Sequence, residues 1–409
     1  MSRWDQKPKT APYTTEEDKE LNEKESRAKE SLRAHLAAKR RKVEPQPSPT
    51  SVHTSVAAPV PQRAEHPGIE SCASVTEYEI LNRIEEGSYG IVSRARHKAT
   101  GELVALKQLK LDKEKYGFPI TSLREIHALM EARHPHIVEL KKLVVGSSLN
   151  QIYLVMEFVE HDLKSLLNRM RMPFRPSEIK ALLMQILSAV ALMHSRWIIH
   201  RDLKTSNLLM SNRGSIKIAD FGLARMFGDP LEDMTNLVVT LWYRAPELLL
   251  GAKKYGTEVD MWSVGCIFAE LLQKKPLFPG KNEADQVTLI FSLLGQPNET
   301  NWPTYSKRPN VPTRVRGPSR SYLSDRFRYC TKAAQDLLQR MLTYDPSRRI
   351  TAEEALQHPY FLEPPPPAHP ESFGSFPSAS SGHRPRHGSP AAPDRRIASE
   401  QRYPLQFDL

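Results

Sequence analysis

The stretch that decides the fold reads His200-Arg201-Asp202-Leu203-Lys204-Thr205-Ser206-Asn207, and Asp220-Phe221-Gly222 follows it after a short apolar run. It places two carboxylates and one amide in a fixed order. That order suits phosphoryl transfer, which needs metal ions to bridge the phosphates and a residue to orient the attacking hydroxyl. Asp202 is the candidate to accept the hydroxyl proton, and Asn207 and Asp220 are candidates to hold Mg²⁺. The alternative is that both aspartates only cap turns in loops.

Composition limits the classes of protein to consider. A length of 409 residues allows two or three domains, and a hydrophobic content of 39% indicates polar tails around an ordinary core. The three cysteines are far apart and form no metal or disulfide pattern, so a reducing compartment is expected. The net charge of +11 favours anionic partners.

The longest apolar segment, residues 181–193, is too short to span a bilayer and is predicted to be a buried helix. The first residues lack the apolar core of a signal peptide.

Both ends of the chain are polar. Residues 1–72 and 364–409 are rich in charged residues, Pro and Ser without apolar periodicity, and both are predicted to be disordered. The run Lys39-Arg40-Arg41-Lys42 resembles a nuclear-import signal. The alternatives are the basic end of a helix or a solvated charge run. The expected location is the nucleus, with the cytoplasm as a second site.

Two further motifs lie between residues 79 and 107. Strand-like apolar runs flank a turn that contains Gly87 and Gly90, and glycines let backbone N–H groups approach the phosphates of a nucleotide. Taken alone, this is only a hairpin signal. The run Val104-Ala105-Leu106-Lys107 follows, and its alternation places Lys107 on one strand face, where an ammonium can reach the α- and β-phosphates.

The order of these motifs resembles that of the eukaryotic protein kinases over roughly residues 76–365. Residues 119–125 read Pro-Ile-Thr-Ser-Leu-Arg-Glu, and this heptapeptide and the pair Thr205-Ser206 are similar to the PITSLRE subfamily of the cyclin-dependent kinases. The resemblance implies an α+β, two-lobed kinase fold. A small β-rich N-lobe is expected over 76–157 and a larger helical C-lobe over 160–363.

The resemblance also implies the roles of the site residues. Catalysis is expected from Asp202, Lys204 and Asn207, and the metal ligands are expected to be Asn207 and Asp220. The residues expected to bind ATP are Ile84, Gly87, Gly90, Val92, Ala105, Lys107, Glu125, Met156, Glu157 and Val159. Glu125 is the expected partner of Lys107. Glu85 stands where the family has a third glycine, and this departure leaves open how the first turn of the loop closes.

Regulatory positions follow from the same comparison of motifs. Thr235 is the expected activating phosphosite, with Arg124, Arg201 and Arg225 as its guanidinium partners. Ser88 and Tyr89 are the expected inhibitory phosphosites. Val238, Val239 and Arg244 are expected to form the pocket for a proline after the target residue. Arg349 is expected to pair with Glu247 in a structural role.

The resemblance implies a proline-directed serine/threonine kinase that uses ATP and Mg²⁺. It also implies activation by a cyclin, which is expected to be of the L type. The expected process is transcription, pre-mRNA processing or the cell cycle. The alternative is a catalytically weak nuclear scaffold that binds a cyclin and RNA-processing factors. The presence of Lys107, Asp202 and Asp220 argues against this alternative. A nucleic-acid-binding protein is a third reading of the charge, but no aromatic-interleaved basic motif or zinc pattern supports it. No membrane partner is expected.

Overall fold

The computed structural model describes residues 72–373, except 87–89, 112–117, 149–150, 229, 232, 235–238, 304 and 312–316. The chain divides into two units, residues 1–69 and 70–409, and all described residues belong to the second. Several predicted positions therefore lie outside the described residues, namely Lys39-Arg40-Arg41-Lys42, Gly87, Ser88, Tyr89, Thr235 and Val238.

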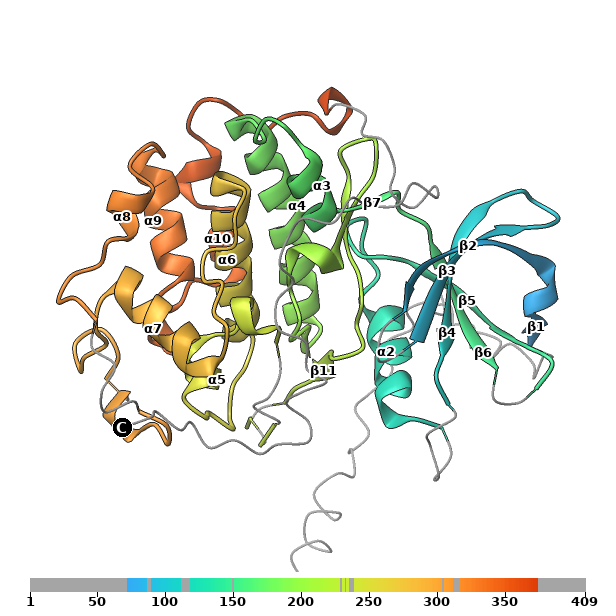
Figure 1. Ribbon diagram of the computed structural model, residues 1–409, viewed down its shortest axis with the longest axis horizontal. Coiled ribbons are helices and arrows are strands. Elements are labelled where there is room, and N and C mark those ends of the chain that lie inside the picture. The colour runs from blue at the N-terminus through green and yellow to red at the C-terminus, as the bar shows by residue number, and fades with distance from the viewer. Residues whose placement is uncertain are drawn as a thin grey trace, which may run out of the picture. The chain divides into compact units, whose positions relative to one another are not determined.

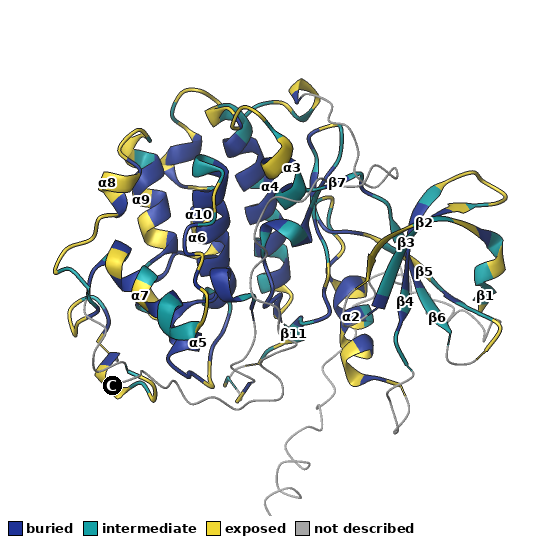
Figure 2. Cartoon of the chain, in the orientation of Figure 1, coloured by how far each residue is buried: buried dark blue, intermediate teal, exposed yellow. Residues whose placement is uncertain are grey.

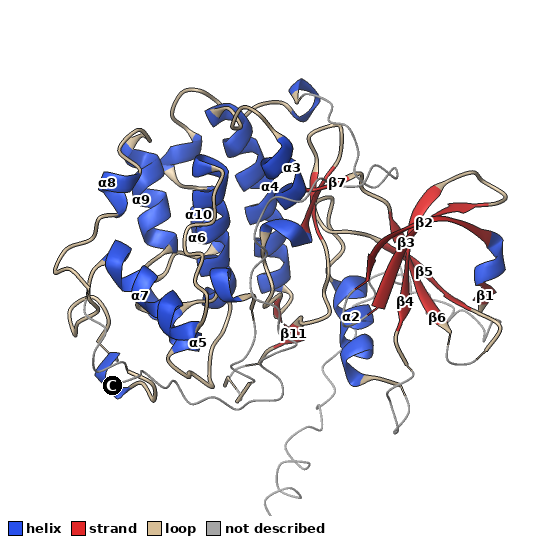
Figure 3. Ribbon diagram, in the orientation of Figure 1, coloured by secondary structure: helices blue, strands red, loops and turns tan. Residues whose placement is uncertain are grey.

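The N-lobe contains a six-stranded sheet in the order β1-β5-β6-β4-β3-β2, and only the β1–β5 pair is parallel (Figure 3). Its strands are β1 (Ala73–Ser74), β2 (Tyr78–Glu86), β3 (Gly90–His97), β4 (Leu103–Leu109), β5 (Leu140–Val145) and β6 (Ile152–Glu157). The predicted lobe boundary at residue 76 thus falls after the first strand. Helix α2 (Ile120–Glu131) follows β4, and Pro119 is its N-cap residue, because the fixed φ angle of proline suits the start of a helix.

Strand alternation gives the sheet two different faces. One face carries a small apolar core of Tyr78, Ala95, Val104, Leu106, Val144 and Val155. On the other face, Val92 of β3 lies opposite Lys107 of β4, and Ala105 lies opposite Met156 of β6. Because a shift of one residue would exchange the faces, this register is what points Lys107 away from the apolar core.

The segment after α2 joins the two lobes. Val138 N–H donates to the Ile218 carbonyl at 2.9 Å, and Ile218 N–H donates to the His136 carbonyl at 2.8 Å. Ile218 ends β10, the strand that comes just before Asp220. One pair of backbone hydrogen bonds therefore joins the segment after α2 to the strand that leads to Asp220.

The C-lobe is built around two helices that are buried over most of their length, α4 (Pro176–Ser195) and α6 (Glu258–Gln273) (Figure 2). Pro176 is the first residue of α4, and Arg175 N–H donates to Glu178 Oε2 at 2.7 Å, so the exposed N–H groups of that helix end are partly satisfied. Helix α6 is mostly apolar and is buried on all sides from Val259 to Leu271, as expected for a core helix, although the buried stretch includes the carboxylates of Asp260 and Glu270.

Smaller elements surround these two helices (Figure 1). The strands are β7 (His161–Asp162), β8 (Ile198–Ile199), β9 (Leu208–Met210), β10 (Ile216–Ile218) and β11 (Arg225–Met226). The helices are α3 (Leu163–Arg169), α5 (Pro246–Leu249), α7 (Glu283–Leu294), α8 (Leu323–Arg326), α9 (Lys332–Met341) and α10 (Ala352–Leu356).

Helix α4 is long and apolar enough, by length and composition alone, to cross a membrane. Its longest apolar run, residues 181–193, is too short for this by itself, but the helix extends beyond that run at both ends, so the expectation from the run alone is corrected. Most of α4 is nevertheless buried within the C-lobe, as predicted for that segment. Such burial is what a core helix of a globular domain shows.

The structure differs from the expected disorder after residue 363. Lys180 on α4 donates to the carbonyls of Glu363 and Pro365 at 2.5 and 2.9 Å. Phe373 is buried, and its ring packs edge-on against the ring of Phe174 with the two ring centroids 6.3 Å apart. A buried lysine and a buried aromatic ring therefore hold the first ten residues of the tail on the lobe, although composition alone suggested a polar, unstructured segment.

Candidate active site

The loop of residues 200–207, which carries the predicted catalytic residues and is called the catalytic loop below, is anchored to α6 through Asp260, which is fully buried. The carboxylate of Asp260 accepts hydrogen bonds from the backbone N–H groups of His200 and Arg201, each at 2.9 Å, and contacts His194 Nε2 at 3.1 Å. Burial alone would raise the pKa of Asp260, but these hydrogen bonds and the two histidines outweigh burial and lower it. The buried, charged carboxylate of Asp260 therefore fixes the start of the loop at His200 and Arg201.

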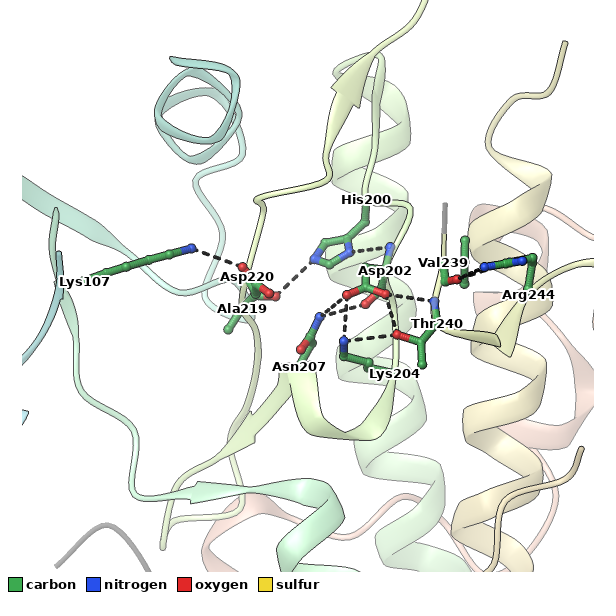
Figure 4. Close-up of polar contacts among 10 residues, drawn as sticks. All are labelled: Lys107, His200, Asp202, Lys204, Asn207, Ala219, Asp220, Val239, Thr240 and Arg244. Atoms are coloured by element: carbon green, nitrogen blue, oxygen red, sulfur yellow. Dashed lines mark hydrogen bonds and ion pairs between the residues drawn. The ribbon is translucent and has the colours of Figure 1, made fainter. Parts of the chain in front are cut away.

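Asp202 lies at the centre of a polar cluster (Figure 4). Its Oδ1 accepts hydrogen bonds from the N–H and hydroxyl of Thr240 at 3.0 and 2.8 Å. Its Oδ2 accepts from Lys204 Nζ at 2.8 Å and from Asn207 Nδ2 at 3.2 Å. Lys204 also donates to Thr240 Oγ1 at 3.1 Å. These donors hold the Asp202 carboxylate in one orientation, as a residue that aligns a hydroxyl requires.

Lys107 contacts two carboxylates that belong to different parts of the chain. Its Nζ donates to Glu125 Oε1 on α2 at 2.5 Å and to Asp220 Oδ1 at 3.1 Å. Burial by itself would lower the pKa of Lys107, but Asp220 and Glu125 outweigh burial, so the pKa lies above its usual value and the ammonium keeps its charge. The structure thus brings together the pair that the resemblance implied, and adds Asp220 to it.

Several of the predicted nucleotide-binding residues lie on the face of the N-lobe sheet opposite its small apolar core. Val92, Ala105 and Met156 share this face through the strand register. A Cβ atom at Gly90 would lie 2.4 Å from the Gln108 carbonyl oxygen, so only glycine fits there. Glu157 ends β6, and Val159 is buried in the segment that follows.

Ile84 and Glu85 lie at an irregularity of β2. The register between β2 and β3 shifts between Arg83 and Glu85, so Ile84 sits at a bulge, and it is exposed. Glu85 pairs with Val92 without a positive φ angle, and β2 continues to Glu86. Strand pairing therefore accommodates the residue that replaces the third glycine, and the backbone at this position does not require glycine.

Comparison with known proteins agrees with this geometry. Residues 78–361 match the family model described as "Protein kinase domain". The chain belongs to the protein kinase family. It is 53% identical over 339 residues to "Cyclin-dependent kinase 11B" of Homo sapiens, which covers 82% of this chain and 42% of the relative. It is 55% identical over 324 residues to "Serine/threonine-protein kinase ppk23" of Schizosaccharomyces pombe, which covers 77% of this chain and 80% of the relative.

These relatives place the kinase in the PITSLRE subfamily of the cyclin-dependent kinases, as the motifs predicted. Its domain is a serine/threonine protein kinase domain with a β-sheet N-lobe and a helical C-lobe. The chain spans less than half the length of the human relatives that it matches.

The arginines predicted to bind a phosphate on Thr235 occupy different environments. Arg124 is exposed on α2, and α2 contacts β11, which carries Arg225. Arg201 is buried, where its Nε donates to the Leu223 carbonyl at 2.8 Å and its Nη1 donates to the hydroxyl of Tyr255 at 2.9 Å. Arg201 is thus held by groups that the motifs did not indicate. Thr235 itself lies outside the described residues.

Of the three residues predicted to form a pocket for a substrate proline, the structure describes Val239 and Arg244. Val239 has a φ angle of 67°, which is unusual for a β-branched residue. Its carbonyl accepts hydrogen bonds from Arg244 Nε and Nη2 at 3.2 and 3.0 Å, and Arg244 also pairs with Glu283 of α7. The strained backbone is therefore stabilised by a buried guanidinium.

A protein kinase domain uses ATP and a divalent metal ion, and the side chains here fit both. Lys107 offers a buried ammonium for phosphate oxygens, and Asn207 and Asp220 offer the oxygen ligands that hard cations prefer. Within the described residues, no group of three His, Cys, Asp or Glu side chains forms a metal site by itself. Two protein ligands are what a metal that also binds substrate phosphates needs.

Sequence reasoning missed Thr240, Asp260 and Tyr255 as parts of the site. Thr240 lies 38 residues after Asp202, and Asp260 lies 60 residues after His200. All three residues lie within residues 76–365, where the chain resembles the protein kinases, and no motif marked any of them individually. Residue types alone do not indicate which hydroxyl or carboxylate will meet the loop.

Proposed function

We propose that this chain is a proline-directed serine/threonine protein kinase that uses ATP with Mg²⁺ and is activated by a cyclin. The observation that carries the catalytic part is the Lys107–Glu125–Asp220 contact beside the Asp202 cluster. ATP supplies the phosphoryl group, and Mg²⁺ neutralises its charge. Lys107 orients the α- and β-phosphates, and Asn207 and Asp220 would hold the metal ion. Asp202 aligns the substrate hydroxyl, and Lys204 lies beside it to meet the γ-phosphate. Positioning and electrostatics account for most of the rate in such sites.

The preference for proline is supported by the Val239 carbonyl. Arg244 already donates two hydrogen bonds to this carbonyl, so it is a poor acceptor for the N–H group of a substrate residue. Proline has no N–H group and leaves no donor without a partner. We therefore assign Ser-Pro and Thr-Pro sites as substrates.

The proposed cyclin contact is supported by the two faces of α2. Glu125 is 3% exposed and meets Lys107, whereas Ile120 and Leu123 are 59% and 49% exposed. Exposed aliphatic residues on the helix that carries the glutamate partner of Lys107 suit a protein partner. The names of the relatives refer to cyclin dependence, and an L-type cyclin is the partner that we propose.

The experiment compares four preparations: the chain with and without an L-type cyclin, each with Thr235 intact or changed to Ala. Phosphorylation of a Ser-Pro peptide should be low without cyclin and should rise strongly with it. It should rise further when Thr235 is phosphorylated, because a phosphate there gains guanidinium partners. Thr235→Ala should remove only this second increase, and Thr288→Ala, which removes an exposed hydroxyl on α7, serves as control. Full activity of Thr235→Ala without cyclin would refute this activation model.

We further propose that the kinase acts in the nucleus, in transcription, pre-mRNA processing or cell-cycle control. The basic run Lys39-Arg40-Arg41-Lys42 supports nuclear import. A fluorescent fusion in which these four residues are Ala should lose its nuclear accumulation. An unchanged distribution would show that the run is not an import signal.

The phosphates proposed for Ser88 and Tyr89 would inhibit the kinase by placing negative charge beside the phosphates of ATP.

A scaffold that binds a cyclin without catalysis is disfavoured, because Lys107, Asp202 and Asp220 are all in place.

A further inference from the structure

A second buried carboxylate on α6, Glu270, has no part in the mechanism above. Glu270 is 3% exposed. The hydroxyl of Tyr243 donates to its Oε2 at 2.6 Å, and the hydroxyl of Thr205 donates to its Oε1 at 3.3 Å. The two hydroxyl oxygens lie 3.0 Å apart. We call Thr205, Tyr243 and Glu270 the hydroxyl triangle.

The triangle connects two short 3₁₀ turns that both lead to Asp202. Thr205 begins the turn Thr205–Asn207, and Asn207 donates to the Asp202 carbonyl and carboxylate. Tyr243 ends the turn Leu241–Tyr243, whose N-cap residue is Thr240. Asn207 and Thr240 are thus neighbours of Asp202 on opposite sides, and each belongs to a turn that Glu270 holds.

Helix α6 therefore holds the catalytic loop at two points. Asp260 holds the backbone before Asp202, and Glu270 holds the turn after it. The two carboxylates are ten residues apart on one helix, which separates them by about 15 Å along its axis. Two separate attachments to a rigid helix restrict the position of Asp202 more than one attachment would.

The environment of Glu270 makes both hydroxyl donors important. Burial raises the pKa of Glu270, whereas the hydroxyl of Tyr243, the nearby Lys164 and the hydroxyl of Thr205 lower it. The Lys164 ammonium itself lies over the Trp242 ring, 4.8 Å from its centroid. A buried carboxylate that loses one donor keeps the full cost of its desolvation, so the turns around it have to rearrange.

We propose that Thr205 is a positioning residue for phosphoryl transfer. Its hydroxyl, together with Tyr243 and Glu270, keeps Asn207 and Thr240 in contact with Asp202. Thr205 touches neither the substrate nor the metal ion, and it acts through Asn207. This inference rests on the proposed kinase function, because it assigns Thr205 a part in that same reaction.

The decisive variant is Thr205→Val in the full chain bound to its cyclin, since valine keeps the shape of threonine and removes the hydroxyl. For a Ser-Pro peptide, kcat should fall about 10-fold or more, because small misplacements of reacting groups are costly, while KM for ATP should stay within about twofold. Thr205→Ser should restore kcat. The matched control is Thr288→Val, which removes an exposed hydroxyl on α7. Equal kcat values for Thr205→Val and Thr288→Val would overturn the proposal.

Hydrogen exchange gives a readout that does not depend on activity. Thr205→Val should speed the exchange of the catalytic-loop amides, residues 202–208, and leave α9 unchanged. A merely structural loss of stability would speed exchange in both regions, and unchanged exchange in the loop would also overturn the proposal. Thr205→Val and Tyr243→Phe should not be additive, because both remove donors to one carboxylate. If the wild-type complex phosphorylated no peptide, the proposed function would fail, while exchange would still test the triangle.

Discussion

Replacing Lys107 by Met is expected to lower phosphoryl transfer by about 10²–10³-fold, the usual cost of removing one preorganised charge-stabilising donor. The ammonium is the group that joins α2 to Asp220, with Nζ at 2.5 Å from Glu125 and 3.1 Å from Asp220. Methionine has a similar length and no charge. Steady-state phosphorylation of a Ser-Pro peptide by the cyclin complex measures the loss.

The same substitution leaves Glu125 buried without its partner, so stability has to be separated from chemistry. Burial raises the pKa of Glu125 and Lys107 opposes this effect, so the carboxyl should take up a proton more readily in Lys107→Met. The double variant Lys107→Met/Glu125→Gln should recover thermal stability but not activity. Lys141→Met, which removes an exposed ion pair with Glu102, is the control. Near-normal turnover of Lys107→Met would refute the role assigned to this lysine.

The second large effect is expected on stability, at the buried pair of Glu247 and Arg349. These residues are 1% and 5% exposed, and the guanidinium donates to both carboxylate oxygens at 2.7 and 2.9 Å. Glu247→Gln leaves a buried guanidinium without a counter-charge, which should cost about 3–5 kcal/mol of unfolding free energy. In thermal unfolding this corresponds to a decrease in Tm of roughly 10 °C.

The matched control for this pair is Arg340→Met. Arg340 pairs with Asp336 at 2.9 Å on α9, where both side chains are about half exposed. Exposed pairs contribute about 0–1 kcal/mol, so Tm should hardly change. The Tm of Arg340→Met should therefore lie close to that of the wild type, and the Tm of Glu247→Gln should lie far below both. If both variants unfolded at the same temperature, the Glu247–Arg349 pair would have no special structural role.

Much of the arrangement was predictable because its signals are local. The short spacing from Asp202 to Asn207 puts both in one loop, and strand alternation put Lys107 on the face opposite the apolar core. The start of α2 after Pro119 placed Glu125 on the inner side of that helix, where it is buried. Each of these depends on a few neighbouring residues, whose periodicity or turn chemistry is visible in the chain.

The sequence by itself determined the family, the two-lobed fold and the loop residues Asp202, Lys204 and Asn207, because ordered motifs of this kind are specific. Only the tertiary structure decided that Thr240 meets Asp202, that Glu270 joins Thr205 to Tyr243, and that the chain after residue 363 returns to Lys180. These contacts join residues far apart in the chain. Buried hydroxyls, carboxylates and carbonyls must find partners, and which partner each one finds depends on how the helices pack.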